Sequence, residues 1–455
     1  MKFKILQFFI IIWFLKGFII EYLLGMSPTT QLSSDPIFIK ILLEGIIIVL
    51  FIFVFDKIKW TKQAMYISLP IFVYFLWAMI SAYQNNLSIL HAIKYSRYFI
   101  YSLFIYFIVK TIKINDVRIK KIILLFYYLV LLQIIISIFN ILFHGVLENR
   151  IGTLLLMSGE LGTIFPLIFL GFFIAYYHIV EKDIKYLFTG WLLLIFAYST
   201  GKIAALIIFP LLYLFYEYYI SNLLGLNISK RVRIIGRVLI ISLIVSPFLV
   251  LYVQNIYFGN VTTSKNTSGF SQITKIIDFA NKYTTGETSG MVRGRMAANT
   301  MLLNSISKNK KYIFGYGPMA LYGEDEKGYG SGFTPVGILY GIVGWARDYL
   351  SLGFPAVIFM FWLIAIVFRR FRKMLKLRKF VPDNVYFIIM GSYLTIFVFV
   401  FDYLFYSAVT FVSGFPIFIL MFGLGISENY IYNSVYYRKN MLTNSNSKVS
   451  IFENE

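Results

Sequence analysis

The chain has 455 residues, of which 59% are hydrophobic and only 14% are charged. A soluble protein of this size needs far more polar residues to cover its surface, so a cytosolic enzyme is excluded. The net charge of +21 favours basic cytoplasmic loops and contacts with anionic lipid over nucleic acid as a partner. The absence of cysteine excludes disulfides, thiolate metal sites and cysteine nucleophiles.

Twelve apolar runs are candidate membrane spans, because a bilayer core takes roughly 20 residues of helix. They lie near 5–24, 37–55, 64–82, 95–111, 121–143, 160–180, 186–200, 203–221, 236–256, 350–368, 384–405 and 408–426. We predict an all-α, polytopic integral membrane protein of about twelve transmembrane helices. Its parts are nine helices in 1–256, a large loop in 257–349, three helices in 350–426 and a cytoplasmic tail in 427–455. The first run has no small-residue cleavage site, which indicates an uncleaved anchor.

Charges in the connections predict the orientation of these helices. The connections 56–63, 110–121, 222–237 and 369–379 are basic, whereas 25–36, 144–159 and 406–407 carry few cations. Short basic loops stay in the cytoplasm, so both termini are expected there. The segment 257–349 then lies outside, where long loops escape this charge rule. A loop of this length between tight connections is where function is expected.

Residues 289–307 (SGMVRGRMAANTMLLNSIS) are predicted to form an amphipathic helix within this loop. Arg293 and Arg295 lie in its first turns, about 200° apart around the axis, so at most one points into a given site. A guanidinium beside the free N–H groups of a helix start suits a phosphate. The alternative is a solvated helix lying at the lipid headgroups.

Lys202 ends the sequence Ser-Thr-Gly-Lys at the outer join of the seventh and eighth runs. This resembles the end of a nucleotide-binding P-loop, but Phe196 stands where that motif needs glycine and no strand precedes it, so a nucleotide site is excluded. A lysine at the mouth of a helix hairpin needs an anionic partner. The alternative is that Lys202 extends to lipid phosphate.

Two further segments combine charges near the predicted outer face. Arg150 and Glu160 bracket an apolar stretch before the sixth run, where Glu160 alternatively caps a helix start. Arg347 and Asp348 precede the tenth run, where they are alternatively an interfacial ion pair of little energetic value. The three histidines lie far apart without metal-ligand spacing, so no metal or other cofactor is predicted.

Five segments, taken in order, resemble the O-antigen polymerase and O-antigen ligase superfamily of bacterial polysaccharide assembly. They are LHAIKYSRYFIYSLFIYFI, RIGTLLLMSGELG, STGKIAALIIF, GRMAANTMLLNSISKNKKYIFGYGP and RDYLSLGFPAVIF. The most specific is the Phe-Gly-Tyr-Gly-Pro stretch at 314–318 behind an arginine-led helix. The resemblance extends over most of residues 85–425.

Departures from the family pattern favour a polymerase over a ligase. Lys202 stands where the family usually has arginine, which keeps the charge but loses the bidentate fork. Ligases typically carry a His-Asn pair before the tenth span, where this chain has Arg347 and Asp348. Counted back from the Phe-Gly-Tyr-Gly-Pro stretch, Arg295 fits the family arginine better than Arg293 does.

The resemblance implies an all-helical, lipid-donor glycosyltransferase (GT-C-like) in the bacterial cytoplasmic membrane. Its donor would be an oligosaccharide repeat on undecaprenyl pyrophosphate, and its acceptor another lipid-linked repeat. Cations would stabilise the leaving pyrophosphate, a carboxylate would take the proton and tyrosines would stack on sugars. The expected residues are Arg295 and Lys202 first, then Arg293, Arg150 and Arg347 as cations, Asp348 or Glu160 as base, and Tyr316 and Tyr322 on the sugars.

Two other functions stay open from the sequence. A ligase that transfers the finished glycan to another lipid acceptor shares these segments. A transporter or flippase of lipid-linked sugars is expected instead to show paired halves around a midplane site. Expected partners are the bilayer, the lipid-linked repeats, and the chain-length regulator and flippase of the same pathway.

Overall fold

The structure, a computed structural model, describes residues 2–19, 37–58, 60–112, 114–144, 159–199, 203–225, 295–318, 343–405 and 415–433. Every regular element within these ranges is a helix. In chain order they are α1 (Lys2–Phe18), α2 (Ile37–Phe55), α3 (Lys62–Gln84), α4 (Ile89–Thr111), α5 (Asp116–His144), α6 (Gly159–Ile179), α7 (Ile184–Ser199), α8 (Ile203–Leu223), α11 (Arg295–Lys308), α12 (Gly344–Leu352), α13 (Phe354–Leu375), the 3-10 helix η3 (Arg378–Phe380), α14 (Asp383–Phe405) and α16 (Phe415–Asn433).

The prediction of an all-helical chain is confirmed for these residues. Helices α3, α13 and α14 and residues 116–139 of α5 are long and apolar enough to cross a membrane by length and composition. Shorter apolar helices occur within α2, α6, α7 and α16. The fold is therefore consistent with a helical membrane protein. The total of twelve spans stays a prediction, and the predicted run 236–256 lies outside the described residues.

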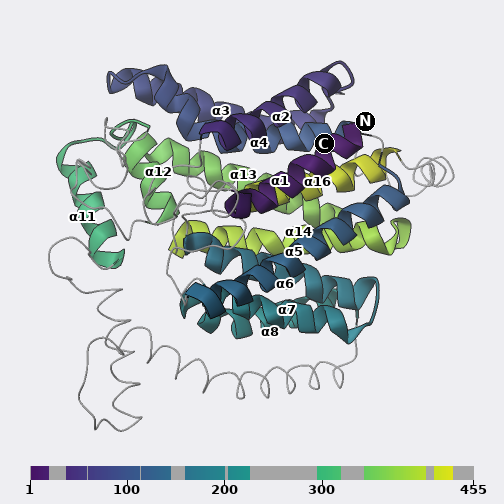
Figure 1. The fold of residues 1–455 in the computed structure, drawn as a ribbon. Coiled ribbons are helices and arrows are strands. Elements are labelled where there is room, and N and C mark those ends of the chain that lie inside the picture. The colour runs from purple at the N-terminus through teal and green to yellow at the C-terminus, as the bar shows by residue number, and fades with distance from the viewer. Residues whose placement is uncertain are drawn as a thin grey trace, which may run out of the picture.

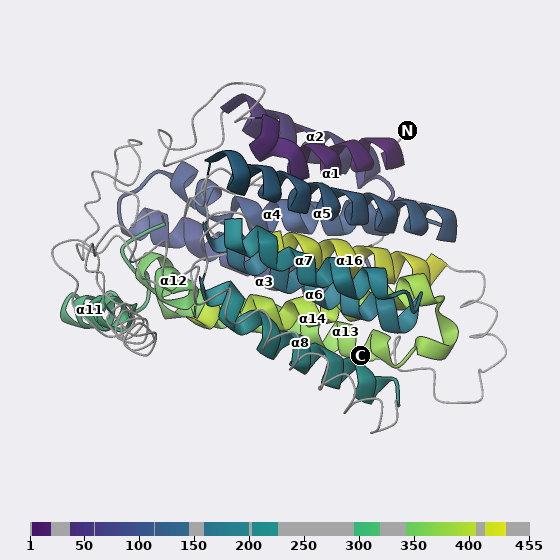
Figure 2. The same ribbon diagram turned by 60° about the horizontal axis from the view of Figure 1, so that its bottom comes forward.

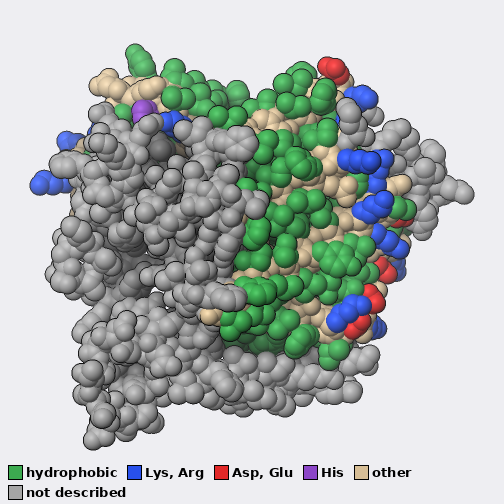
Figure 3. All heavy atoms as spheres, in the orientation of Figure 1, with side chains coloured by type: hydrophobic (Ala, Val, Ile, Leu, Met, Phe, Trp, Pro, Cys, Tyr) green, Lys and Arg blue, Asp and Glu red, His purple; other side chains and the backbone are tan. Residues whose placement is uncertain are grey.

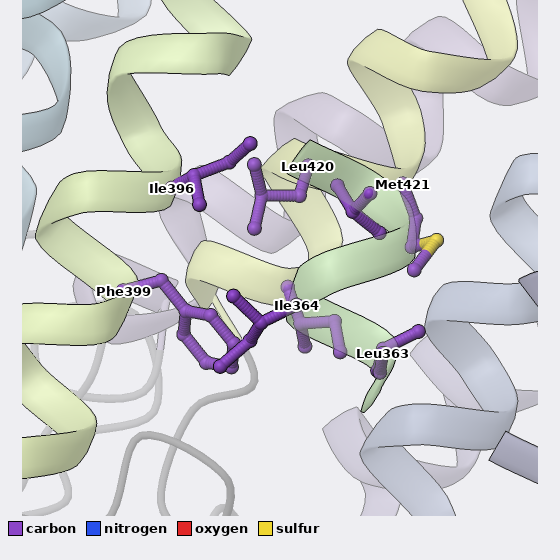
Figure 4. Close-up of a pocket in the computed structure, with 8 residues that line it drawn as sticks. Leu363, Ile364, Ile396, Phe399, Leu420 and Met421 are labelled. Atoms are coloured by element: carbon purple, nitrogen blue, oxygen red, sulfur yellow. The ribbon is translucent and has the colours of Figure 1, made fainter. Parts of the chain in front are cut away.

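The long helices lie side by side in one bundle (Figures 1 and 2). Helix α14 runs through its interior and packs against α6, α13 and α16, while α4 packs against α2, α3 and α16. Figure 4 shows Ile364, Ile396 and Leu420 meeting where α13, α14 and α16 come together. The cavity left among these side chains is about 10 Å³, hardly enough for one water, so the packing there is close.

Local sequence explains where several helices begin and end. The Thr61 side chain accepts a hydrogen bond from the Ala64 backbone at 3.2 Å and caps α3. The Ser88 side chain accepts one from the Leu90 backbone, also at 3.2 Å, and caps α4. Such oxygens satisfy backbone N–H groups that have no partner within the helix.

Buried charges tie the helix ends together at the end of the bundle that holds the N terminus. Lys110 Nζ of α4 donates to Glu428 Oε2 of α16 at 2.8 Å, and Arg370 of α13 lies 3.8 Å from the same carboxylate. Figure 3 shows Lys and Arg side chains along this edge, beside a broad hydrophobic band. Since 21 residues separate Ile89 from Lys110, this end lies about 30 Å from the start of α4.

Candidate functional site

Two of the segments on which the predicted site depends, within 295–318 and 343–354, lie at the opposite end of the bundle. Helices α11 and α12 lie together there, away from the N terminus (Figures 1 and 2). The connection between α3 and α4 lies at the same end, because Lys311 Nζ donates to Asn85 Oδ1 at 2.9 Å. We call residues 81–88, 311–318 and 343–354 the outer platform, after the side on which the loop charges predict it to lie.

The Phe-Gly-Tyr-Gly-Pro turn caps the C-terminal end of α12. The Tyr316 backbone N–H donates to the Leu350 carbonyl at 2.7 Å, and that of Gly317 donates to the Ser351 carbonyl at 2.9 Å. These bonds satisfy carbonyls that a helix end leaves without partners. Gly315 has φ +60°, and a Cβ there would lie 2.5 Å from the Leu350 carbonyl oxygen. Glycine at 315 is therefore required for the turn to approach α12.

The same turn is fixed to α3. The Ser81 hydroxyl donates to the Phe314 carbonyl at 2.6 Å. The Trp77 indole stacks on the Phe314 ring with centroids 5.2 Å apart and donates to the Leu352 carbonyl at 2.8 Å. Residues more than 230 positions apart in the chain thus form one small, rigid unit.

Asp348 lies on α12, within the outer platform, and is fully buried. The hydroxyls of Tyr74 and Tyr95 donate to its Oδ1 at 2.9 and 2.8 Å, and the hydroxyl of Tyr403 donates to its Oδ2 at 2.9 Å. These tyrosines come from α3, α4 and α14. One carboxylate therefore links α12 to three long helices of the bundle.

The surroundings of Asp348 oppose its ionisation. Burial raises the pKa of the Asp348 carboxyl to about 6, while the three tyrosine hydrogen bonds and the charge of Arg347 act in the other direction. Desolvation is the larger effect because the carboxylate is removed from water on all sides. Burial thus shifts this carboxyl toward its neutral form.

Two other predicted site residues belong to the platform. Arg347 is half-buried beside Asp348 on α12. The Tyr316 hydroxyl lies 2.9 Å from Ser305 Oγ and accepts a hydrogen bond from Asn309 Nδ2 at 2.6 Å. Tyr316 thereby holds the end of α11 against the turn. Its expected role of stacking on a sugar stays a prediction.

Arg295 begins α11, and its backbone lies close to the platform. Asn299, one turn later, accepts a hydrogen bond from the Val343 backbone at 3.4 Å. The two α11 residues are about 6 Å apart along the helix axis. The predicted helix 289–307 is thus described from Arg295 onward, and the start of α11 lies beside the start of α12.

Other predicted site residues lie partly or wholly outside the described part of the chain. Glu160 is the second residue of α6, and its side chain is not described. Arg150, Lys202, Arg293 and Tyr322 lie outside the described residues. If Arg295 and Lys202 both hold the donor pyrophosphate they must converge, and this stays a prediction because Lys202 lies outside the described residues.

The three tyrosines around Asp348 are absent from the sequence prediction. Tyrosines within apolar runs are equally expected as interfacial anchors, so the residue type alone did not indicate that these three bind a carboxylate. Among the described residues, no group of three or more His, Asp or Glu side chains is arranged to hold a metal ion. Comparison of the sequence with models of known protein families and with curated proteins gave no match.

Proposed function

We propose that this protein is a membrane glycosyltransferase that polymerises oligosaccharide repeats carried on undecaprenyl pyrophosphate. One observation carries the proposal. The turn at 314–318 and the helix bearing Arg347 and Asp348, two segments of the family resemblance, pack together at the end of the bundle opposite Lys110 and Arg370. Basic helix ends are typical of the cytoplasmic side. The outer platform then faces the side on which lipid-linked repeats are presented.

The reaction proposed is a substitution at an anomeric carbon. A hydroxyl oxygen of the acceptor sugar attacks this carbon and forms the new glycosidic bond. The bond from the carbon to the pyrophosphate oxygen breaks, and undecaprenyl pyrophosphate leaves with the electron pair. The hydroxyl proton passes to a base. Negative charge grows on the leaving group, so fixed cations in a dry site would lower the barrier.

Arg295 and Lys202 are the cations that we assign to the leaving pyrophosphate. A helix start leaves backbone N–H groups without partners inside the helix, and such a start beside Arg295 suits phosphate. Arg347 is half-buried on the platform, next to the start of α11. We assign it as a third cation of the site, and its side chain is among those that the structure describes. Arg150 and Arg293 remain second choices for donor binding.

The burial of Asp348 bears on which carboxylate, Asp348 or Glu160, acts as the base. A sugar hydroxyl reaches a base directly or through one water, and Asp348 is enclosed by three tyrosine hydroxyls with no exposed surface. We therefore favour Glu160 as the base and assign Asp348 to holding α12 in place. Tyr322 stays assigned to sugar contact.

Deletion of the gene from its host, followed by sizing of the surface and carrier-linked glycans, tests the proposed activity. A polymerase predicts single repeats on the carrier and loss of long chains. Long chains stranded on the carrier would instead identify a ligase. An unchanged glycan profile would contradict both.

Variants of the two cations test the proposed site. Loss of one such electrostatic donor costs about 10²–10³ in rate, so Arg295→Ala and Lys202→Ala should insert normally yet make little long-chain glycan. Lys202→Arg should retain most activity, whereas Arg295→Lys loses the bidentate fork. Arg293→Ala should be milder, because the predicted helix would direct its side chain about 200° away from that of Arg295. Normal chain length with Arg295→Ala at normal expression would refute this assignment.

The predicted orientation has its own test in this cysteine-free chain. Cysteines are introduced singly at Ser268 and Lys376 and treated with a membrane-impermeant thiol reagent. In intact cells Ser268→Cys should react, and Lys376→Cys should react only after lysis. Labelling of Lys376→Cys in intact cells would place the basic connections outside and overturn the proposed sidedness.

A further inference from the structure

A cavity of about 280 Å³ lies within the bundle between α5, α6, α7, α14 and α16. It is far from the outer platform. Its lining begins near Ile122 of α5 and Lys185 of α7, both at the end that carries Lys110, and continues to Val130 of α5 and Phe169 of α6. The cavity therefore occupies the half of the bundle that we assign to the cytoplasmic leaflet.

The depth of the cavity matches one lipid leaflet. Eight residues of α5 separate Ile122 from Val130, which corresponds to about 12 Å of helix. A bilayer hydrocarbon core is about 30 Å thick, so one leaflet contributes about 15 Å. The cavity is thus about as long as the hydrocarbon chain of a single lipid.

The walls of the cavity favour hydrocarbon over water. Most of the lining is aliphatic or aromatic, and its polar side chains are four tyrosines, Ser392 and Lys185. An apolar cavity of about 150 Å³ stays dry and accepts a small hydrocarbon. This cavity is larger. Leu124 and Tyr128 line it and are 48% and 63% exposed on α5, so its rim faces the lipid side of the bundle.

Charges at the mouth of the cavity suit an anionic headgroup. Lys185 Nζ lies 2.8 Å from Asp183 and 3.6 Å from Glu181, and half of its side chain remains exposed. The segments 116–121 and 181–185, which precede or begin α5 and α7, contain five cations and three carboxylates. The two helices adjoin here, since the Tyr127 and Tyr186 rings lie 5.6 Å apart. The net positive charge attracts anionic lipid.

We propose that this cavity binds one acyl chain of an anionic phospholipid from the cytoplasmic leaflet, with the lipid phosphate beside Lys185. The site is independent of the proposed glycosyl transfer, since it lies at the other end of the bundle. A resident lipid chain would fill the space between α5 and the interior helices α14 and α16.

Photo-crosslinking of the full-length protein in phosphatidylcholine vesicles tests this site. The probe is phosphatidylglycerol with a diazirine in the middle of one acyl chain, and labelled peptides are mapped by mass spectrometry. Labelling should concentrate in 122–130, 169–176 and 387–392. The exposed face of α13, represented by Ile358 and Phe361, gives the background of general lipid contact. Cavity labelling no higher than this background would overturn the proposal.

Two pairs of variants separate the chain from the headgroup. Val130→Trp fills the cavity and should abolish most of its labelling, whereas Ile135→Trp, on the exposed face of the same helix, should not. Lys185→Gln, at a half-exposed position, removes one charge and should lower cavity labelling by the anionic probe about fivefold, as expected for one lysine at an anionic surface. Lys185→Arg should preserve it. Equal labelling by phosphatidylglycerol and phosphatidylcholine probes would refute the headgroup assignment.

Discussion

Replacement of Asp348 by alanine should destabilise the fold strongly, because the residue is fully buried and its hydrogen-bond partners cannot turn to water instead. Three tyrosine hydroxyls lose their acceptor, at about 2 kcal/mol each, or about 6 kcal/mol together. Removing the carboxylate also removes its own burial penalty, which outweighs the effect of these hydrogen bonds on its pKa and raises that pKa to about 6. This relief offsets part of the loss, so the net destabilisation expected at neutral pH is about 2–4 kcal/mol.

Asp348→Asn is the informative partner of this variant. The amide keeps a carbonyl acceptor and adds a donor that Tyr403 can accept, and it carries no charge to be desolvated. Its effect should stay within about 1 kcal/mol of the parent. Both are measured as the free energy of unfolding in mixed micelles, with the exposed Asp56→Ala as control. If Asp348→Ala lost less than about 1 kcal/mol, or if Asp348→Asn lost as much, the hydrogen-bond account would be refuted.

Three more predictions concern single positions. Because the pKa of Asp348 is raised in the folded state, the folded state binds more protons than the unfolded state between about pH 4 and pH 6. The free energy of unfolding should therefore fall as pH rises through this window. The Asp348→Asn variant should not show this fall. Gly353→Ala should cost at least about 1 kcal/mol and loosen the turn, because φ is +81° and the new methyl meets the Ile313 carbonyl; an unchanged thermal midpoint would contradict this. Glu428→Ala should cost about 3–5 kcal/mol because it strands the buried Lys110 cation, whereas a joint Glu428→Ala and Lys110→Met variant should recover part of the loss.

The positions of the long helices were accessible from the sequence for a simple reason. Bilayer thickness fixes the length of an apolar helix, so a run of hydrophobic residues predicts both its type and its extent. The same reasoning placed the start of the tenth span at 350, whereas the structure ends α12 at Leu352 and begins α13 at Phe354. The break depends on a left-handed glycine at 353, which an average over apolar residues does not detect.

The candidate site was predicted only in part, because its contacts are long-range. Arg347 and Asp348 were selected as a charged pair before the tenth run and Tyr316 through the family resemblance, and the structure places all three on the outer platform. Their surroundings depend on α3, α4 and α14. Nothing local to Tyr74 indicates that its hydroxyl meets a carboxylate 274 positions later. Such pairings depend on which helices pack together, and the hydrophobic periodicity of a single sequence does not predict this.

The carboxylate shared by three helices also bears on the order of synthesis. Tyr74 and Tyr95 are synthesised when some 250 residues remain to be made before Asp348, and Tyr403 follows Asp348 by 55 residues. Until then the early hydroxyls must bond to water, lipid or chaperone, since apolar surroundings penalise an unpaired hydroxyl. Completion of the outer platform thus coincides with arrival of the last helices. A nascent chain stopped before Tyr403 would leave Asp348 Oδ2 without the hydroxyl that donates to it in the complete fold.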